Sequence, residues 1–255
     1  MEFASQDQFL YGDLTAKIRK MLEPVAHDSF LFFEDTIALL EPQIGTGKKV
    51  LDAGCGRGTY TAWLAQKGCD VVSIDSNPHH IAKAKELLKE SNLQNKVTLE
   101  LSKLPDSFPE DHFDIVLDCF SWWHISDWGR LFNLTRKNLK PHGKLLILDT
   151  LFGWKTTVDF RKEVLEKWHT AFPTYNECRN MLIKREFRLL KEESIQNSFV
   201  RYLDSLFEKI QLLEKEDLGV SDPMELKQVK SMCEWFKNAA HSEELVATFL
   251  VAELT

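Results

Sequence analysis

Between residues 48 and 150 the chain alternates short apolar runs with longer segments of helical periodicity, and this alternation is its most constraining feature. The apolar, β-rich runs are residues 50–52, 71–74, 97–101, 113–117 and 143–149. Helical patterns lie between them at 59–67, 78–89 and 128–139. Runs that are apolar nearly throughout are typical of strands buried on both faces. The alternation therefore predicts a mostly parallel sheet with helices on both faces.

After residue 150 the pattern changes, and two amphipathic helices separate the last two expected strands. We expect a helix at 160–168 and strands at 187–195 and 245–254. Residues 199–213 carry apolar side chains at helical spacing, and a second helix starts at Asp222-Pro223. These helices can be packing for the core. They can also form a helical cap, residues 197–240, over the carboxyl ends of the strands, where open α/β sheets bind ligands.

The composition fits a single domain over residues 1–255, of which 1–47 are expected to form N-terminal helices. A formal net charge of −7 makes nucleic acid an unexpected partner. The sequence has no run of 18 apolar residues and no basic, apolar leader at its start, which predicts a cytoplasmic protein without a membrane span. Five scattered cysteines without CxxC spacing predict reduced thiols and no metal site. Nothing in the composition indicates the oligomeric state.

A glycine-rich loop follows the first strand in the stretch KKVLDAGCGRGTY, residues 48–60. A dinucleotide site has the spacing GxGxxG, whereas Gly54, Gly56 and Gly58 give GxGxG. The carboxylate of Asp52 would repel a pyrophosphate and suits a ligand with positive charge. Asp75, at the end of the next strand, is placed to accept hydrogen bonds from both hydroxyls of a ribose. S-adenosylmethionine has a ribose, an ammonium and a sulfonium but no phosphate, and it fits this pattern.

Four stretches resemble, in order and spacing, the successive motifs of the class I S-adenosylmethionine-dependent methyltransferases: VLDAGCGRG, VVSIDSNPHHIAKAKE, FDIVLDCF and LKPHGKLLILD. The resemblance covers about residues 48–150, the expected cofactor-binding core. It implies a Rossmann-like, seven-stranded sheet whose last strand is antiparallel. The helical insertion before that strand resembles the cap of the small-molecule methyltransferases in the family.

The resemblance also implies positions for the cofactor. It places Asp52 near the methionine moiety, Gly54 and Gly56 under the cofactor, Asp75 on the ribose and Ser76 against the adenine.

One corner of the expected cofactor site departs from the family pattern. The family often has an acid and a small residue after the third strand, near the adenine amine, but Ser102 and Lys103 stand there. Backbone contacts to the adenine remain available, and an acid could reach the amine only from Asp106. Asp118, at the end of the fourth strand, is expected to line the cofactor pocket through its backbone.

The acceptor side is expected in the loop after the fourth strand, which reads DCFSWWHISDW. His124 is the candidate catalytic base, because imidazole titrates near neutral pH, and its alternative is a structural role. Trp122 and Trp123 are candidates for substrate binding or for plain core. Trp154, after the fifth strand, is a similar candidate, and family analogy adds Tyr11.

Together these features predict S-adenosylmethionine-dependent methyl transfer to a small molecule by in-line displacement. Two alternatives stay open at this point. The chain could methylate a protein or an RNA, or it could bind the cofactor without catalysis.

Overall fold

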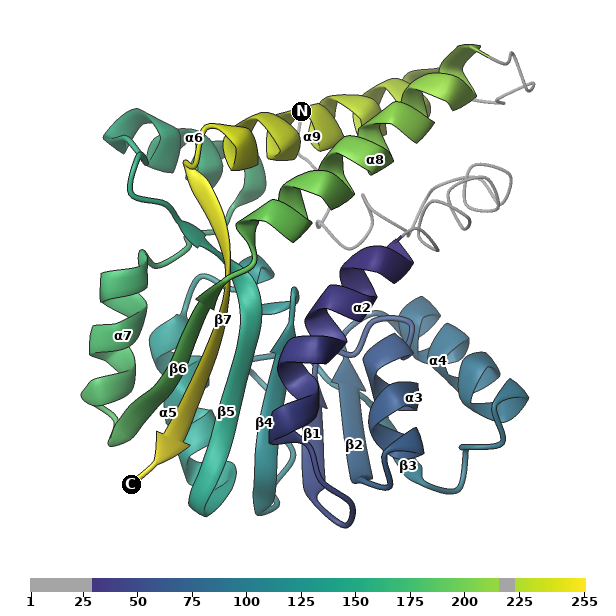
Figure 1. Cartoon of the computed structure of the whole chain (residues 1–255), viewed down its shortest axis with the longest axis vertical. Helices are drawn as coiled ribbons and strands as arrows, with labels where there is room; N and C mark the ends of the chain where they lie inside the picture. The colour runs from purple at the N-terminus through teal and green to yellow at the C-terminus, as the bar shows by residue number, and fades with distance from the viewer. Residues whose placement is uncertain (1–28, 216–222) are drawn as a thin grey trace.

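A computed structural model describes residues 29–215 and 223–255, which build one seven-stranded sheet (Figure 1). The strands are β1 Lys49–Ala53, β2 Asp70–Asp75, β3 Val97–Leu101, β4 Phe113–Cys119, β5 Leu139–Phe152, β6 Phe187–Ser194 and β7 Leu245–Leu254. Their order across the sheet is β3-β2-β1-β4-β5-β7-β6. Strands β1 to β5 run parallel, and β7 lies antiparallel between β5 and β6. The expected Rossmann-like sheet with an antiparallel last strand is confirmed.

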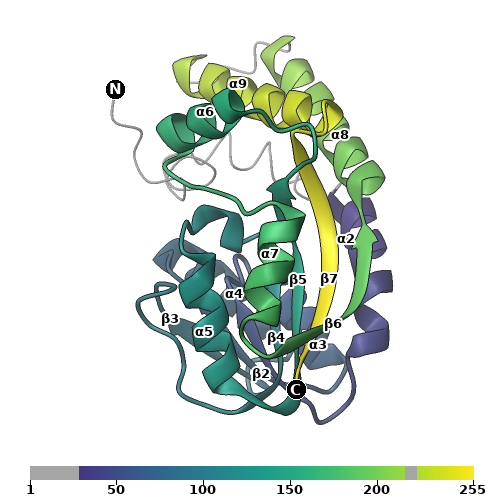
Figure 2. The same cartoon turned by 90° about the vertical axis from the view of Figure 1, so that its left-hand side faces the viewer.

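Helices cover both faces of this sheet, as the alternating pattern predicts (Figure 2). The helices are α2 Ser29–Leu40, α3 Thr59–Gln66, α4 Pro78–Glu90, α5 Trp128–Asn138, α6 Val158–Trp168, α7 Tyr175–Ile183, α8 Gln196–Lys215 and α9 Pro223–His241, with short 3₁₀ turns η2 Glu41–Gln43 and η3 Trp122–His124. Buried residues of α3 and α4 share one hydrophobic cluster with one face of the sheet, and those of α5 and α7 share another with the opposite face. The described residues include no helix long and apolar enough to cross a membrane.

Local capping explains where several of these helices begin. Asn77 accepts a hydrogen bond from His79 N (2.9 Å) at the start of α4, with Pro78 as the first helical residue. Helix α7 starts with a capping box between Thr174 and Glu177. Helix α7 was not expected from the sequence, although its Thr-x-x-Glu signal is present.

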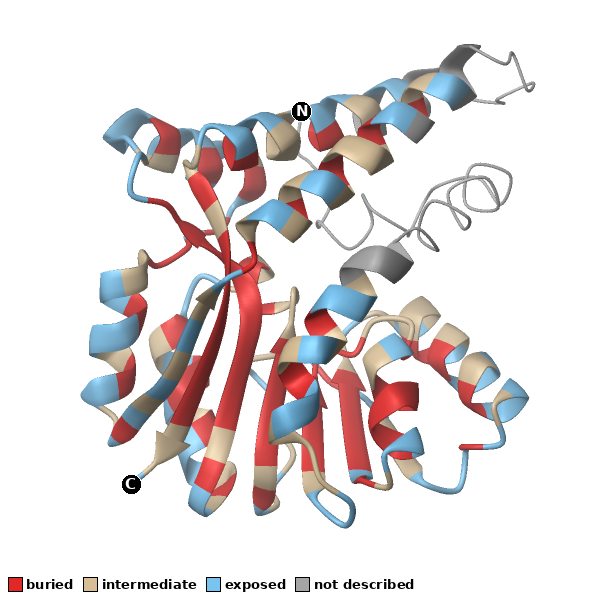
Figure 3. Cartoon of the chain, viewed as in Figure 1, coloured by how far each residue is buried: buried red, intermediate tan, exposed pale blue. Residues whose placement is uncertain are grey.

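The two helices between β6 and β7 form with α6 a layer above the carboxyl ends of the strands (Figure 1). Aromatic contacts hold this layer together: Phe160 stacks on Trp235 with ring centroids 5.4 Å apart, and Trp168 lies 5.3 Å from Trp235. The inner sides of these helices are buried and their outer sides are exposed (Figure 3). The layer therefore has an apolar underside of its own.

Candidate active site

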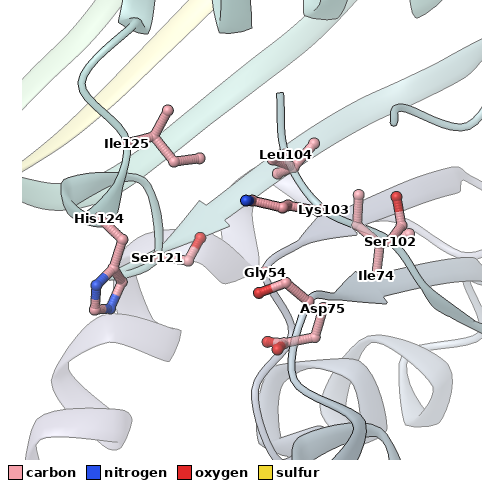
Figure 4. A pocket seen from close by; sticks show the side chains of 10 residues that line it. Gly54, Ile74, Asp75, Ser102, Lys103, Leu104, Ser121, His124 and Ile125 are labelled. Carbon is pink, nitrogen blue, oxygen red and sulfur yellow. The ribbon is translucent and has the colours of Figure 1, made fainter. Parts of the chain in front are cut away.

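Two adjoining cavities lie at the carboxyl ends of β1, β2 and β4. The smaller, about 150 Å³, is lined mainly by residues that follow β2, β3 and β4 (Figure 4). The larger, about 280 Å³, is lined by the glycine loop, the start of α3 and the loop after β4. Gly54, Asp75, Ser121 and His124 line both cavities. The two cavities therefore meet at these four residues and form one elongated site.

Several backbone N–H groups of the glycine loop donate hydrogen bonds to other atoms of the protein. Gly54 N and Cys55 N donate to Ile74 O (2.9 and 2.8 Å), and Gly58 N donates to Cys55 O (3.0 Å). Gly56 N donates to Asp75 Oδ2 (2.8 Å). A pyrophosphate-binding loop needs such N–H groups for its ligand. These four N–H groups are therefore taken by protein acceptors and are not offered to a phosphate.

Close packing requires glycine at position 54. The residue has a φ of +100°, and a Cβ there would lie 2.3 Å from the Ser121 side chain. Ser121 in turn donates its hydroxyl to Ala53 O (2.7 Å). Gly54 thus lets the loop after β4 close onto the end of β1.

Asp75 lies at the junction of the cavities as a charged carboxylate. Burial acts to raise its pKa, but hydrogen bonds from His80, Asn77 N and Gly56 N outweigh it, so the pKa lies below its ordinary value. Asn77 N donates to Oδ1 (2.9 Å), and His80 Nδ1 lies 3.3 Å from the same oxygen. Because a carboxylate offers about four acceptor positions, three protein donors leave room for a ligand hydroxyl.

Asp52 lies in the larger cavity and is almost fully buried. Burial raises its pKa to about 7, although Thr61 Oγ1 donates to Asp52 Oδ2 (2.6 Å) and partly offsets this effect. The charge of Asp75 adds to the rise. A carboxyl in this state ionises when a cation binds beside it.

Two buried carboxyls, Asp118 and Asp149, hold the loop that follows β4. Asp118 Oδ1 accepts hydrogen bonds from Ser121 N (3.2 Å) and Trp122 N (3.1 Å), and Ser121 Oγ lies 2.6 Å from the same oxygen. Asp149 Oδ2 accepts one from Trp123 N (2.9 Å). Three consecutive N–H groups of the loop are thus fixed by the ends of two neighbouring strands.

The ionisation of these two carboxyls is linked. Burial raises the pKa of Asp118 well above its ordinary value, and the charge of Asp149 adds to this rise; burial also raises the pKa of Asp149, to about 7. Asp118 Oδ2 has no hydrogen-bond partner among the described residues. Asp118 lines neither cavity. Its place is beneath the loop that carries His124, rather than in the wall where the sequence led us to expect it.

The two adjacent tryptophans of this loop have different surroundings. Trp122 is fully buried against Trp128 and Phe132 and lines neither cavity. Trp123 lines the larger cavity and donates its indole N–H to Phe120 O (3.0 Å). The ring of His124 lies against that of Trp123, with centroids 3.7 Å apart.

The remaining candidates from the sequence fall outside the cavities or beyond the described residues. Trp154 is 79% exposed, with the Lys155 ammonium 4.7 Å from its ring centroid, and lines neither cavity. Tyr11 lies outside the described residues. Ser76, Ser102 and Lys103 line the smaller cavity.

At the corner where the family often has an acid, Ser102 Oγ donates to Ser107 O (2.8 Å). The amino group of Lys103 points into the cavity (Figure 4). Asp106 lies outside the lining and pairs with Arg130 (3.0 Å). Asp75 is consequently the single acid among the described residues of the smaller cavity.

Sequence reasoning missed several residues of the larger cavity, among them Tyr60, His80 and Phe120. Tyr60 follows directly on the glycine loop, which is the one signal that could have identified it. The others are brought in by the fold. The described residues contain no cluster of three His, Cys, Asp or Glu suited to a metal ion.

Comparison with protein families and curated proteins finds the following. A family model described as a methyltransferase domain matches residues 25–194. Methyltransferase GfsG of Streptomyces halstedii is 31% identical over 110 residues, 42% of this chain and 39% of that protein. The demethylmenaquinone methyltransferase of Tropheryma whipplei is 30% identical over 153 residues, 56% of this chain and 63% of that protein. The chain thus aligns with less than two thirds of the length of these relatives.

Solved structures share the fold at low sequence identity. A putative sarcosine dimethylglycine methyltransferase from Galdieria sulphuraria has a TM-score of 0.75 and 16% identity, covering 90% of this chain and 84% of that one. Phosphoethanolamine N-methyltransferase 2 of Haemonchus contortus, in complex with S-adenosylhomocysteine, has a TM-score of 0.71 and 22% identity, covering 82% of this chain and 49% of that one. At these identities the likeness concerns the fold alone.

Proposed function

Because the chain belongs to the methyltransferase-domain family, we propose that it transfers a methyl group from S-adenosylmethionine to a small-molecule acceptor by in-line displacement. One observation carries the proposal: two cavities of different character meet at Gly54, Asp75, Ser121 and His124. An elongated cofactor would place its adenosine in the smaller cavity and its methionine in the larger. The rest of the larger cavity is left for the acceptor.

The residues present fit this cofactor. Asp75 would accept from the ribose, with Ser76, Ser102 and Lys103 around the adenine. The absence of a Cβ at Gly54 opens the space beside Ser121. Asp52 faces the larger cavity, where it would stabilise the positive charge of the methionine moiety.

When bound, S-adenosylmethionine supplies a methyl group that its sulfonium has already activated. The protein then has to align the acceptor and exclude water. Asp118 and Asp149 fix the loop that carries His124, so this side chain is held where the two cavities meet. His124 would take a proton from the acceptor wherever the acceptor has one to lose.

A small acceptor agrees with the size of the larger cavity, about 280 Å³, and with the relatives. The cap helices reach its wall, since Phe236 of α9 lies edge-on to Trp123 at 5.3 Å and Phe199 of α8 stacks on Phe120 at 5.7 Å. The lining itself comes from residues outside the cap. Closure of the acceptor pocket by residues 197–240 stays a prediction, as does a cytoplasmic location.

Calorimetry with S-adenosylmethionine and S-adenosylhomocysteine tests the cofactor assignment. Asp75→Ala should weaken binding at least about tenfold, because a hydrogen bond to a charged group contributes about 1.5–3 kcal/mol. Asp106→Ala is the matched control, since this carboxylate lies outside both cavities, and its affinity should be unchanged. Equal affinities in folded Asp75→Ala and wild-type protein would refute the assignment. Cofactor binding without methyl transfer to any acceptor would instead favour a protein that binds the cofactor without catalysis.

A further inference from the structure

The larger cavity offers hydrogen-bond acceptors and aromatic surface, and from this we infer that the methyl acceptor is an amine that donates an N–H to the phenol oxygen of Tyr60. The inference rests on the proposed function and specifies its substrate class. It assigns Tyr60 a direct role in acceptor binding.

The direction of one chain of hydrogen bonds determines whether the Tyr60 hydroxyl donates to a ligand or accepts from it. Thr36 Oγ1 lies 2.8 Å from Phe33 O and 2.7 Å from Tyr60 Oη. A carbonyl oxygen only accepts, so the single hydroxyl proton of Thr36 goes to Phe33. Thr36 Oγ1 must then accept from Tyr60, which gives its own proton away. The Tyr60 oxygen is left with lone pairs and can only accept a hydrogen bond from a ligand.

The charged residues that line the larger cavity favour the same kind of ligand. Asp52 and Asp75 both line the larger cavity, and no Lys or Arg belongs to its described lining. Its potential cations are His80 and His124, of which His80 lies against Asp75. A carboxylate or phosphate on the acceptor would therefore meet repulsion, while a group that gains positive charge would be stabilised.

Aromatic rings complete the wall. Tyr60, Phe120 and Trp123 line the cavity, and Phe199 supports Phe120 from behind by stacking at 5.7 Å. Aromatic faces attract cations and also bury apolar groups. They suit an amine carried on an apolar or aromatic body.

The charge change during transfer distinguishes an amine from the other possible acceptors. The amine lone pair forms the new N–C bond while the S–C bond breaks and its electron pair stays on sulfur. Positive charge thus moves from sulfur to nitrogen, and the resulting ammonium releases a proton to His124 or to water. A hydroxyl or carbon acceptor would have to develop negative charge before attack, which the acids of this cavity disfavour.

A set of matched probes tests the inference: benzylamine, benzyl alcohol and benzoate share one ring and differ in the polar group. Calorimetry of each probe against the S-adenosylhomocysteine complex measures binding without turnover. Mass spectrometry then detects methylated product with S-adenosylmethionine. We expect benzylamine to bind at least about tenfold more tightly than benzoate and more tightly than the alcohol, a difference of about 1.4 kcal/mol or more. Amines that bind no better than their matched alcohols and carboxylates overturn the inference.

Two variants separate a hydrogen-bonding role of Tyr60 from a structural one. Tyr60→Phe removes the acceptor oxygen and keeps the ring, so amine affinity should fall about tenfold while affinity for S-adenosylhomocysteine is unchanged. Thr36→Val keeps the phenol but removes the partner of its proton, so Tyr60 can donate into the cavity. In that variant the affinity for benzylamine should fall, and the affinities for benzyl alcohol and benzoate should rise. Tyr175→Phe, a tyrosine that bonds Glu192 and lines neither cavity, is the matched control.

The outcomes also separate this inference from the proposed function. If the protein binds neither S-adenosylmethionine nor S-adenosylhomocysteine, the proposed function fails. If it binds the cofactor and methylates phenols or carbon acids in preference to amines, only the substrate class is wrong. If Tyr60→Phe lowers the affinity for the cofactor and leaves the affinity for the amine unchanged, Tyr60 contacts the methionine moiety instead, and the inference is overturned. If that variant does not fold, Thr36→Val decides: an equal loss for all three probes refutes the inference.

Discussion

The two cavities of the site are built by different means. The smaller is formed by strand ends and the first residues after them, and its central acid is fixed by two backbone N–H groups and His80. The larger is walled by the side chains of Tyr60, Phe120 and Trp123, with rings of the cap behind two of them. Backbone geometry leaves little freedom, whereas side chains can change without altering the fold. On the proposed function, the cofactor would occupy the constrained cavity, and the acceptor would occupy the cavity that can be adapted to different substrates.

Asp118 supports both cavities at once, and its loss should have the largest effect. Asp118→Ala removes the acceptor for the backbone N–H groups of Ser121 and Trp122, so we expect the free energy of unfolding to fall by about 2–4 kcal/mol and cofactor affinity to be lost. Urea unfolding and calorimetry measure the two effects. Asp127→Ala removes only the N-terminal cap of α5 and should cost about 1 kcal/mol without altering cofactor affinity. If Asp118→Ala behaves like this control, the loop does not depend on the carboxyl pair.

Gly54 tests the constrained cavity more locally. In Gly54→Ala the new Cβ would collide with Ser121, and the positive φ adds strain of about 1–3 kcal/mol, so cofactor affinity should fall between about 5-fold and 100-fold. Gly47→Ala is the control for backbone strain alone, because its φ is +77° and nothing lies within 4 Å of an added Cβ. Comparable cofactor affinity in the two variants would show that the contact with Ser121 is unimportant.

Asp52 links cofactor affinity to pH. Its pKa of about 7 means that the carboxyl is largely protonated below neutral pH and must lose that proton to stabilise a cationic ligand. Affinity for S-adenosylmethionine should therefore rise up to about tenfold per pH unit below 7 and level off above it. Calorimetry in buffers of different ionisation enthalpy measures the proton released, and Asp52→Asn should remove the dependence. A flat profile in the wild-type protein would contradict the assignment.

The raised pKa of Asp52 also makes the stability of the fold depend on pH. Stability should fall as the pH rises, whereas cofactor affinity should increase. Because this pKa lies above the ordinary value of 3.8, the neutral carboxyl favours the folded state. The contribution of the neutral carboxyl to the free energy of unfolding is fully present below pH 3.8 and is lost as the pH rises to about 7.

A substitution behind the wall of the larger cavity should have the smallest effect of those considered. It should change only the binding of the acceptor. Phe199→Leu removes the ring behind Phe120 and keeps an apolar side chain, a change that usually costs less than about 1.5 kcal/mol. We expect KM for the acceptor to rise a few-fold while affinity for S-adenosylhomocysteine stays the same. A loss of cofactor affinity of similar size would show that the two cavities are not independent.

Residue type and spacing were enough to predict the seven-stranded sheet, which the structure confirms, and to propose residues for the cofactor. Apolar runs at β1, β2, β4 and β5 could be recognised because strands buried on both faces admit few polar residues. Gly54, Gly56 and Asp75 could be proposed for the cofactor because local backbone requirements appear directly as residue type and spacing, and their contact with a ligand stays a prediction. The one helix that was missed, α7, has only nine residues and a short apolar pattern.

The assembly of the rest of the site depends on contacts that appear only in the folded chain. The adjacent residues Trp122 and Trp123 have different surroundings, because successive side chains of the 3₁₀ turn η3 point in different directions and only Trp123 reaches the cavity wall. The role of Asp118 depended on Asp149, which is thirty-one positions away in sequence, and the acceptor character of Tyr60 depended on Thr36 from another helix. Such properties arise from contacts between distant segments. A sequence pattern records which groups are available, whereas their hydrogen-bond partners, and hence their chemistry, are set by the packing of the folded chain.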